Sequence, residues 1–244
     1  MRTKLLILGG TGDAAALAWA VEAAYGTHIE TITSLAGRAG IPDLPGHVHV
    51  GGFGGAEGLQ AYLKAEAIGR VIDATHPFAA RISAHAEAAC AALGLPRLVL
   101  ARPEWTPQPG DRWIEVASMA EAAAALPRLG RCAFLTVGAG ETAAFTHLPE
   151  VWFLVRLLKD EPLPLARYGV VTARPPFTVE GERHLMQDHA IDLLVSKNSG
   201  GTATYAKIEA ARILGLPVLM IRRPPPPGGP MVETVQAAVE WAGY

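Results

Sequence analysis

Short apolar runs of strand length recur along the chain, and several are separated by stretches with helical spacing. The runs occupy residues 4–8, 29–33, 47–50, 70–74, 97–101, 132–137, 151–157, 192–196 and 217–222. One helical stripe holds Ile82, Ala86, Ala89, Cys90 and Leu93, and another holds Ala206, Ala210, Ile213 and Leu214. Strands that alternate with helices predict a parallel α/β architecture.

Both striped helices are expected to end at the same short sequence, "LGLP". Gly94 and Gly215 suit the left-handed position just after a helix, and the following prolines cannot continue it. Sliding 73–103 onto 194–224 without a gap matches these residues and also Arg102-Pro103 with Arg223-Pro224. The pattern indicates an internal repeat.

A second pair of similar stretches supports the repeat. "LGGTGDAAAL" begins at residue 8 and "VGAGETAAF" at residue 137, and both contain Gly-x-Gly-acid-x-Ala-Ala. We therefore expect two Rossmann-like parallel-sheet lobes, 1–103 and 131–244, with the active site in the cleft between them. Residues 104–130 begin with a Pro-rich polar stretch and are predicted to form a linker, with 102–113 as a possible lid. The tail "RRPPPPGGP" is expected to connect to a last helix at about 231–242.

Composition narrows the classes of function. The chain has 244 residues, half of them hydrophobic, and its formal charge is −2. Without a dense basic run, a nucleic-acid partner is not favoured. The first apolar run is too short for a membrane span or a signal peptide. Cys90 and Cys132 fit free thiols of a cytoplasmic protein better than a disulfide.

The first glycine loop points to a dinucleotide. Gly9, Gly10, Thr11, Gly12 and Asp13 follow the first strand and open a helix. Glycines allow close approach to a pyrophosphate, and the helix start supplies N–H donors. A plain strand-to-helix turn is the alternative.

The end of the second strand favours NADPH over NADH. NAD sites usually carry an acid there, whereas this chain has Ser34, Gly37 and Arg38. A guanidinium and a hydroxyl suit a 2′-phosphate. The alternative is a solvated surface arginine.

Further loops extend this site. Phe53 lies among four glycines in "GGFGGAEGL", which is either backbone close to the cofactor or a flexible turn. "DATHPF" brings Thr75 and His76 to a strand end, and "KNSGG" is its counterpart in the second lobe. The second glycine loop contains Gly138 and Gly140. We assign the cofactor to the first lobe and the substrate to the second.

Several stretches together carry a family resemblance. They are "LILGGTGDA", "TSLAGR", "GGFGGAEGL", "VIDATHPFAARIS", "RPEW", "LVSKNSGG" and "AKIEAARILGLPVLMIRRP", in this order along nearly the whole chain. The chain resembles the precorrin-6A reductase family of cobalamin biosynthesis. The resemblance implies an NADPH-dependent reduction of one ring double bond of a tetrapyrrole, giving precorrin-6B, and neighbouring pathway enzymes as further candidate partners.

The tetrapyrrole carries many carboxylates, which explains the polar loops. The residues expected to bind it are His76, Arg81, Arg102, Gly138, Gly140, Lys197, Asn198, Ser199, Gly200, Gly201 and Arg223. His76 is also the candidate catalytic residue, as proton donor or as an anchor for a carboxylate. For Lys197 the alternative is a solvated loop residue.

Other functions explain less of the sequence. Short-chain dehydrogenases need Tyr-x-x-x-Lys, and no tyrosine here has a lysine four residues on. A non-catalytic NADPH-binding protein leaves "DATHPF" and "KNSGG" unexplained. A cobalt-containing substrate stays open. A protein-bound metal is not expected, because His47/His49 and His184/His189 lack a third ligand.

Overall fold

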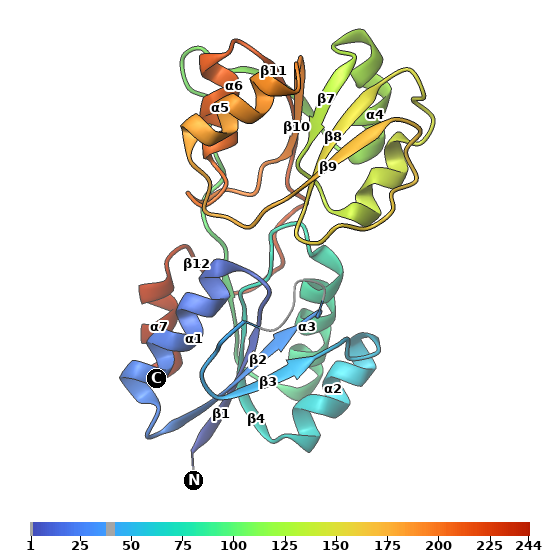
Figure 1. Cartoon of the computed structure of the whole chain (residues 1–244). Coiled ribbons are helices and arrows are strands. Elements are labelled where there is room, and N and C mark those ends of the chain that lie inside the picture. Colours follow the sequence, from blue (N-terminus) through green and yellow to red (C-terminus); the bar gives the residue numbers. More distant parts are fainter. Residues whose placement is uncertain (1, 38–41) are drawn as a thin grey trace. The chain divides into compact units, whose positions relative to one another are not determined.

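The chain folds into two compact units, each built on its own parallel sheet (Figure 1). The computed structural model describes residues 2–37 and 42–244. Unit 1 comprises Met1–Pro103 and Pro224–Tyr244, and unit 2 comprises Glu104–Arg223. The predicted α/β class with two sheet-based lobes is confirmed.

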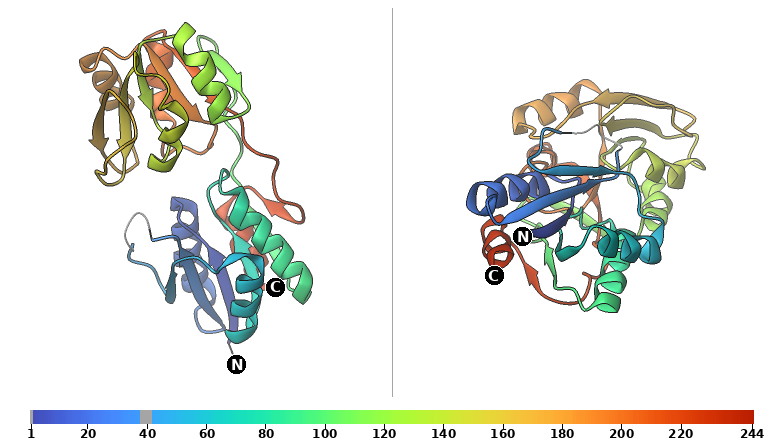
Figure 2. Two further views of the ribbon diagram at one scale, coloured as in Figure 1. Left: turned by 90° about the vertical axis from the view of Figure 1, so that its right-hand side faces the viewer. Right: turned by 90° about the horizontal axis from the view of Figure 1, so that it is seen from below.

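Unit 1 is a six-stranded sheet covered by helices on both faces. Its strands are β1 (Thr3–Leu8), β2 (Ile29–Leu35), β3 (His47–Val50), β4 (Ile68–Asp73), β5 (Arg97–Leu100) and β12 (Met231–Val232), in the order β3-β2-β1-β4-β5-β12. Its helices are α1 (Gly12–Tyr25), α2 (Gly55–Ala65), α3 (Ala80–Leu93) and α7 (Val235–Gly243). Helix α1 packs against α7 and α2 against α3, and Figure 2 shows these pairs from two further directions.

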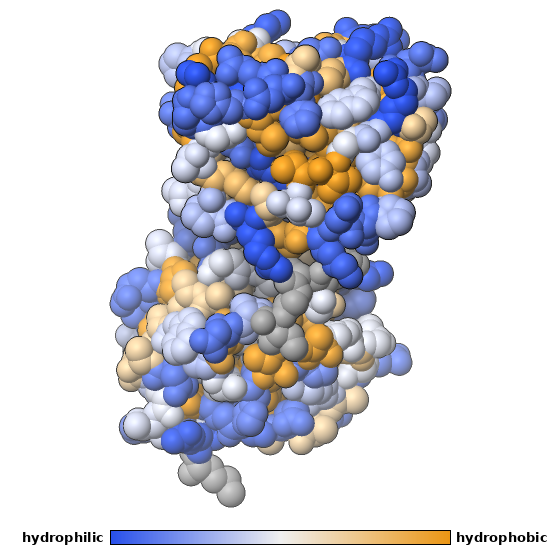
Figure 3. Space-filling model, in the orientation of Figure 1, coloured by the Kyte–Doolittle hydropathy of each residue, from blue (hydrophilic) through white to orange (hydrophobic). Residues whose placement is uncertain are grey.

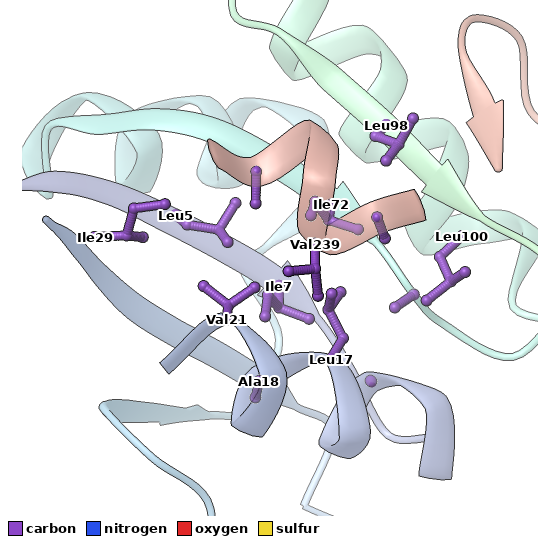
Figure 4. Close-up of a cluster of buried hydrophobic side chains, with 14 residues drawn as sticks. Leu5, Ile7, Leu17, Ala18, Val21, Ile29, Ile72, Leu98, Leu100 and Val239 are labelled. Atoms are coloured by element: carbon purple, nitrogen blue, oxygen red, sulfur yellow. The ribbon is translucent and has the colours of Figure 1, made fainter. Parts of the chain in front are cut away.

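The two chain ends share one core in unit 1. Figure 4 shows Leu5 and Ile7 of β1 facing Leu17 and Val21 of α1, with Val239 of α7 closing the cluster. All five side chains are buried. Full burial of such an aliphatic side chain stabilises the fold by roughly 1.5–3 kcal/mol. The last helix is therefore a structural part of the N-terminal unit.

Unit 2 has six strands in an equivalent order. They are β6 (Arg112–Val116), β7 (Cys132–Leu135), β8 (Trp152–Leu157), β9 (Tyr168–Thr172), β10 (Leu193–Lys197) and β11 (Pro217–Ile221), in the order β6-β11-β10-β7-β8-β9. Its helical segments are α4 (Met119–Ala125), η1 (Leu126–Arg128), η2 (Ala139–Phe145), α5 (Val179–Asp188) and α6 (Ala206–Ile213), of which η1 and η2 are 3₁₀ helices.

The topologies of the units match strand for strand. Read from β3 to β12, unit 1 has the same spatial order as unit 2 read from β9 to β6. Edge strand β6 and helix α4 precede β7 in the chain, whereas their counterparts β12 and α7 end the chain. The two units are thus the same fold with a different starting point, which accounts for the repeat in the sequence.

The unit boundaries differ from the expected ones. Residues 104–130 were expected to form a linker, but β6 and α4 lie within them and belong to unit 2. Residues 224–244 were expected in the second lobe, but β12 pairs with β5, with Met231 opposite Val99. Pairing at a sheet edge, rather than position in the chain, decides to which unit each segment belongs.

Smaller features of the fold follow the sequence. Gly94 and Gly215 have φ angles of 63° and 66°, as expected for glycines that end α3 and α6. In the face drawn in Figure 3, hydrophilic side chains cover much of each unit, and smaller hydrophobic patches interrupt this cover. Within residues 2–37 and 42–244, no helix has the length and apolar character needed to cross a bilayer.

Candidate functional site

The glycine loop of unit 1 joins β1 to α1, as the dinucleotide motif requires. Gly10 has a φ angle of +99°, which a side chain would strain. The Thr11 hydroxyl accepts from the N–H of Ala14 at 3.1 Å and donates to the carbonyl of Ala74 at 2.8 Å. Thr11 thereby caps α1 and ties the loop to the chain beyond β4.

A pocket of about 760 Å³ opens over the carboxyl ends of the strands in unit 1. Its lining comprises Leu8, Gly9, Ser34, Ala36, Gly51, Gly52, Phe53, Gly54, Gly55, Thr75, Phe78, Ala79, Arg81, Ile82 and His85. These residues lie at or just beyond the ends of β1, β2, β3 and β4, or belong to α2 and α3. The strand order changes direction at β1, which is where α/β sheets of this order bind nucleotides.

The pocket unites several predicted cofactor residues. Gly9, Ser34, Phe53 and Thr75 all line it. Arg81, which the sequence assigned to the substrate, lines the same pocket. His85 was not predicted, although its position one helical turn after Arg81 was a signal that the two share a face of α3.

Other predicted cofactor residues lie outside this lining. Gly10, Thr11 and Gly12 form the turn and the start of α1. The carboxylate of Asp13 pairs with Arg102 at 2.6 Å, so Arg102 neutralises the acid of the glycine loop. Gly37 has a φ angle of +76°, and Arg38 falls outside the described residues.

Aromatic rings support the glycine-rich loop after β3. The ring of Phe53 stacks on His49 with centroids 4.6 Å apart and meets Tyr62 of α2 at 5.0 Å. Burial, and to a smaller extent the nearby charge of Glu66, raise the pKa of Tyr62. Phe53 is therefore held from behind by two rings while it lines the pocket, rather than lying in a free turn.

His76 lies directly beyond β4. Its Nδ1 accepts from the N–H of Phe78 at 3.3 Å, and the two rings are 5.8 Å apart. With Nδ1 used as an acceptor, a neutral ring carries its proton on Nε2. This atom can donate to a carboxylate or release a proton.

In unit 2 the lysine of "KNSGG" pairs with the second glycine loop. The Nζ of Lys197 lies 2.8 and 3.0 Å from the two carboxylate oxygens of Glu141. Glu141 also accepts from the N–H of Gly138 at 2.7 Å. The cation expected to meet the substrate is thus held at the carboxyl end of β10 by an acid of the same unit.

The side chain of Asn198 makes hydrogen bonds within the protein. Its side-chain oxygen accepts from the N–H of Trp105 at 2.9 Å, and its side-chain nitrogen donates to the carbonyl of Trp105 at 3.0 Å. The indole N–H of Trp105 donates to the carbonyl of Gly201 at 2.7 Å. The expected role of the Asn198 amide as a donor to the substrate therefore does not match its contacts.

The other residues of the "KNSGG" loop lie around the contact between Asn198 and Trp105. Gly200 and Gly201 have φ angles of 66° and 72°, which explains two glycines in succession. Arg223 donates to the carbonyl of Asn198 at 2.8 Å. Ser199 is buried beside them, while Gly138 and Gly140 lie exposed in the neighbouring loop of unit 2. The predicted substrate residues thus form two groups: His76, Arg81 and Arg102 in unit 1, and the others in unit 2.

Comparison with known proteins decides the family. The family model described as "Precorrin-6x reductase CbiJ/CobK" matches residues 4–243. The chain belongs to the precorrin-6x reductase family. The resemblance noted in the sequence is confirmed, and the chain is an oxidoreductase that reduces a precorrin-6 tetrapyrrole in cobalamin biosynthesis.

Individual relatives cover the whole chain. Precorrin-6A reductases of Rhodococcus erythropolis and Rhodobacter capsulatus are 48% and 44% identical, over 99% and 98% of this chain and 98% and 95% of their own. A cobalt-precorrin-6A reductase of Priestia megaterium is 30% identical over 96% of each chain. A solved CobK precorrin-6A reductase superposes with a TM-score of 0.92 at 42% identity, over 99% of this chain and 96% of that one.

Residues with metal-binding chemistry are dispersed. Within the described part of the chain, no three His, Cys, Asp or Glu side chains are grouped so that they could hold an ion. The family's reaction needs a reductant, and the pocket of unit 1 has the size and position for a nicotinamide dinucleotide.

Proposed function

We propose that the protein reduces metal-free precorrin-6A to precorrin-6B with NADPH. Unit 1 binds the cofactor and unit 2 binds the tetrapyrrole. The observation that carries the cofactor assignment is the pocket over β1–β4, which is lined by glycines, Arg81 and His85. In the described part of the chain, no Asp or Glu belongs to this lining.

The absence of an acid at the end of β2 supports NADPH. Ser34 lines the pocket there and is 7% exposed. A hydroxyl leaves room for a 2′-phosphate, whereas a carboxylate would repel it. Arg38 follows in the sequence and supplies the guanidinium that pairs with this phosphate.

The chemistry divides between cofactor and protein. NADPH supplies a hydride to one ring carbon, and a proton is added to the neighbouring carbon, so that one double bond becomes single. The protein holds the two reactants and excludes water. His76 donates this proton or binds a carboxylate of the substrate. Lys197 and the amides of Gly200 and Gly201 bind further carboxylates.

The metal-free substrate is favoured by degree of relationship. Relatives named for precorrin-6A are 44–48% identical in the two cases above, against 30% for the cobalt-precorrin relative. The two cysteines are free, and with NADPH as reductant they fit work in the cytoplasm.

The reaction itself is the first test. The purified protein is incubated without oxygen with NADPH and precorrin-6A, and the products are analysed by mass spectrometry. The expected product is heavier by two hydrogen atoms and forms as NADPH absorbance falls. If the protein reduced cobalt-precorrin-6A but not precorrin-6A, the assignment of the metal-free substrate would be excluded.

Cofactor choice is tested at Arg38. We expect Arg38→Ala to weaken NADPH binding at least tenfold, because a charge-assisted pair with the 2′-phosphate is lost. NADH lacks this phosphate and should bind the variant as it binds the parent. Titration of both cofactors checks this, and equal weakening would exclude Arg38 as the 2′-phosphate ligand.

A further inference from the structure

A buried carboxylate lies directly beneath the cofactor pocket of unit 1. Asp73, the last residue of β4, is 2% exposed. Its Oδ1 accepts from the N–H of Thr75 at 3.1 Å and from the Thr75 hydroxyl at 2.7 Å. Its Oδ2 is buried and has no hydrogen-bond partner among the described residues. Keeping such a group in a protein interior is costly, so its retention calls for a role.

The contact with Asp73 fixes what the Thr75 hydroxyl can do. A hydroxyl has one proton to donate and two lone pairs to accept with. Because the proton of Thr75 points to Asp73, the 3.3 Å contact between the hydroxyls of Thr75 and Ser83 must be donated by Ser83. One lone pair of Thr75 remains. Thr75 lines the pocket, so it offers a bound molecule an acceptor and no donor.

The position of Thr75 indicates which part of the cofactor it meets. Thr75 follows β4 and Ser34 is the next-to-last residue of β2, and these strands flank β1 on opposite sides. In sheets of this order, the two halves of a dinucleotide lie on opposite sides of this point. With the adenosine half at Ser34, as proposed above, the nicotinamide half falls to Thr75. Phe78 and Ile82 line the same pocket and offer an apolar wall for the ring.

We infer that the Thr75 hydroxyl, oriented by Asp73, accepts a hydrogen bond from the carboxamide N–H₂ of the nicotinamide. Thr75 touches the cofactor, and Asp73 acts through it as a positioning residue. The inference rests on the proposed function, because it presumes a nicotinamide cofactor in this pocket. It adds a purpose for the contact: fixing the carboxamide fixes the rotation of the ring, and thereby the face from which the hydride leaves.

An analogue of the cofactor isolates this hydrogen bond. In the 3-acetylpyridine analogue of NADP⁺, a methyl group replaces the amide nitrogen, so the donor is lost and the shape is kept. Calorimetric titration of the whole protein is expected to show that NADP⁺ binds about tenfold more tightly than the analogue, the typical cost of leaving one buried acceptor unpaired.

Substitutions at Thr75 then assign the preference. Thr75→Val should weaken NADP⁺ about tenfold and should not weaken the analogue, because the acceptor that the analogue leaves unpaired is gone, so that the preference for NADP⁺ disappears. Thr75→Ser keeps the hydroxyl and should keep the preference. Ser34→Ala is the matched control in the same pocket, because it should weaken both molecules equally.

The role of Asp73 has its own pair of variants. Asp73→Asn retains an oxygen that accepts from Thr75 and should preserve the preference, whereas Asp73→Ala should abolish it. Circular dichroism establishes that each variant is folded before its titration is interpreted. Restoration of the preference by asparagine distinguishes orientation of Thr75 from a requirement for the charge.

The outcomes separate this inference from the proposed function. A parent protein that binds NADP⁺ without preference over the analogue would overturn the inference and leave the cofactor assignment standing. Equal weakening of both molecules by Thr75→Val would do the same. A parent protein that binds neither molecule would instead overturn the cofactor assignment, and the inference with it.

Discussion

At the scale of single residues, both glycine loops contain an acid that the same unit neutralises. Asp13 pairs with Arg102 and Glu141 with Lys197. A carboxylate near the phosphates of a nucleotide, or near the carboxylates of a tetrapyrrole, would repel them. The paired cations remove this repulsion, and in unit 2 the cation is the residue that we expect to bind substrate.

Substitution of Lys197 tests that expectation. Lys197→Ala should raise the Michaelis constant for precorrin-6A about tenfold, because one charge-assisted contact is lost and Glu141 is left without its cation. NADPH affinity should not change. Steady-state kinetics and cofactor titration measure both. Lys159→Ala removes an exposed lysine of the same unit and should change neither value. An unaltered Michaelis constant for Lys197→Ala would reduce this residue to a support for the loop.

The buried thiol of Cys90 predicts a pH dependence of stability. Burial raises the pKa of Cys90 from 9.0 to about 11. Below pH 9 the thiol is protonated in both folded and unfolded chains, so stability does not vary on its account. Between pH 9 and 11 only the unfolded chain ionises, and the free energy of unfolding should fall by up to roughly 3 kcal/mol. Urea unfolding at pH 8 and 10.5 measures this, and Cys90→Ala should remove most of the difference. If the free energy of unfolding of Cys90→Ala falls with pH as steeply as that of the parent, other titrating groups cause the fall.

At the scale of elements, the stretch 104–111 is fastened along α6. Trp105 is held by Asn198 at one end, and Asp111 pairs with Arg212 at 2.9 Å at the other. The side chain of Lys207 lies over the Trp105 ring, 5.1 Å from its centre. A lid would be free at its tip and hinged at its ends, and these contacts instead hold the stretch near both of its ends. The stretch is a strut that is held along α6 and leads into β6.

Asn198→Asp should loosen this strut. The carboxylate cannot donate to the carbonyl of Trp105, and it would face the carboxylate of Glu104, which lies 3.3 Å from the present amide nitrogen. We expect unit 2 to lose about 2–4 kcal/mol of stability. Hydrogen exchange of β10 and β11 measures the loss.

A matched control separates this effect from the added charge. Gln108→Glu makes the same change of amide to carboxylate at an exposed position of the stretch. It should cost less than about 0.5 kcal/mol. If both variants exchange alike, the Asn198 side chain does not hold the strut.

At the scale of the whole molecule, unit 1 is completed by a segment distant in sequence, whereas unit 2 is one continuous stretch. Helix α7 ends the chain, yet its residues Ala238, Val239 and Ala242 are buried in the core of unit 1 (Figure 4). Val239 packs with residues of β1 and α1 from the other end of the chain. The stability of the N-terminal unit therefore depends on the C-terminal helix.

Val239→Asp tests this dependence. A carboxylate placed in the core should destabilise unit 1 by about 3 kcal/mol or more, because it is buried without a partner. Hydrogen exchange should rise in β1, β4 and β5 and stay unchanged in the strands of unit 2. Glu240→Ala, on the exposed side of the same helix, should leave both units unaffected. A uniform rise across both sheets would mean that the units unfold together.

The sequence by itself determined the class of fold, nine of the strand segments and the repeat. Buried parallel strands need nearly continuous apolar runs, so the eight interior strands stand out in the sequence, and of the edge strands β3 was predicted as well. It also determined the family, because "DATHPF" and "KNSGG" occur in order with the glycine loop. The ends of α3 and α6 could also be predicted, because a helix often ends at a residue in the left-handed conformation, which glycine adopts without strain.

Only the tertiary structure decided the edges of the sheets and the partners of the charges. Strands β6, β9 and β12 went unpredicted because edge strands are covered on fewer sides and need no apolar run. For the same reason the boundaries of the units were misplaced. The pairing of Lys197 with Glu141, the use of Asn198 by Trp105 and the burial of Asp73 under Thr75 depend on side chains that approach only when separate strands align. The sequence shows which polar side chains lie at the carboxyl ends of the strands. The packing of the folded chain decides which of these side chains contact one another.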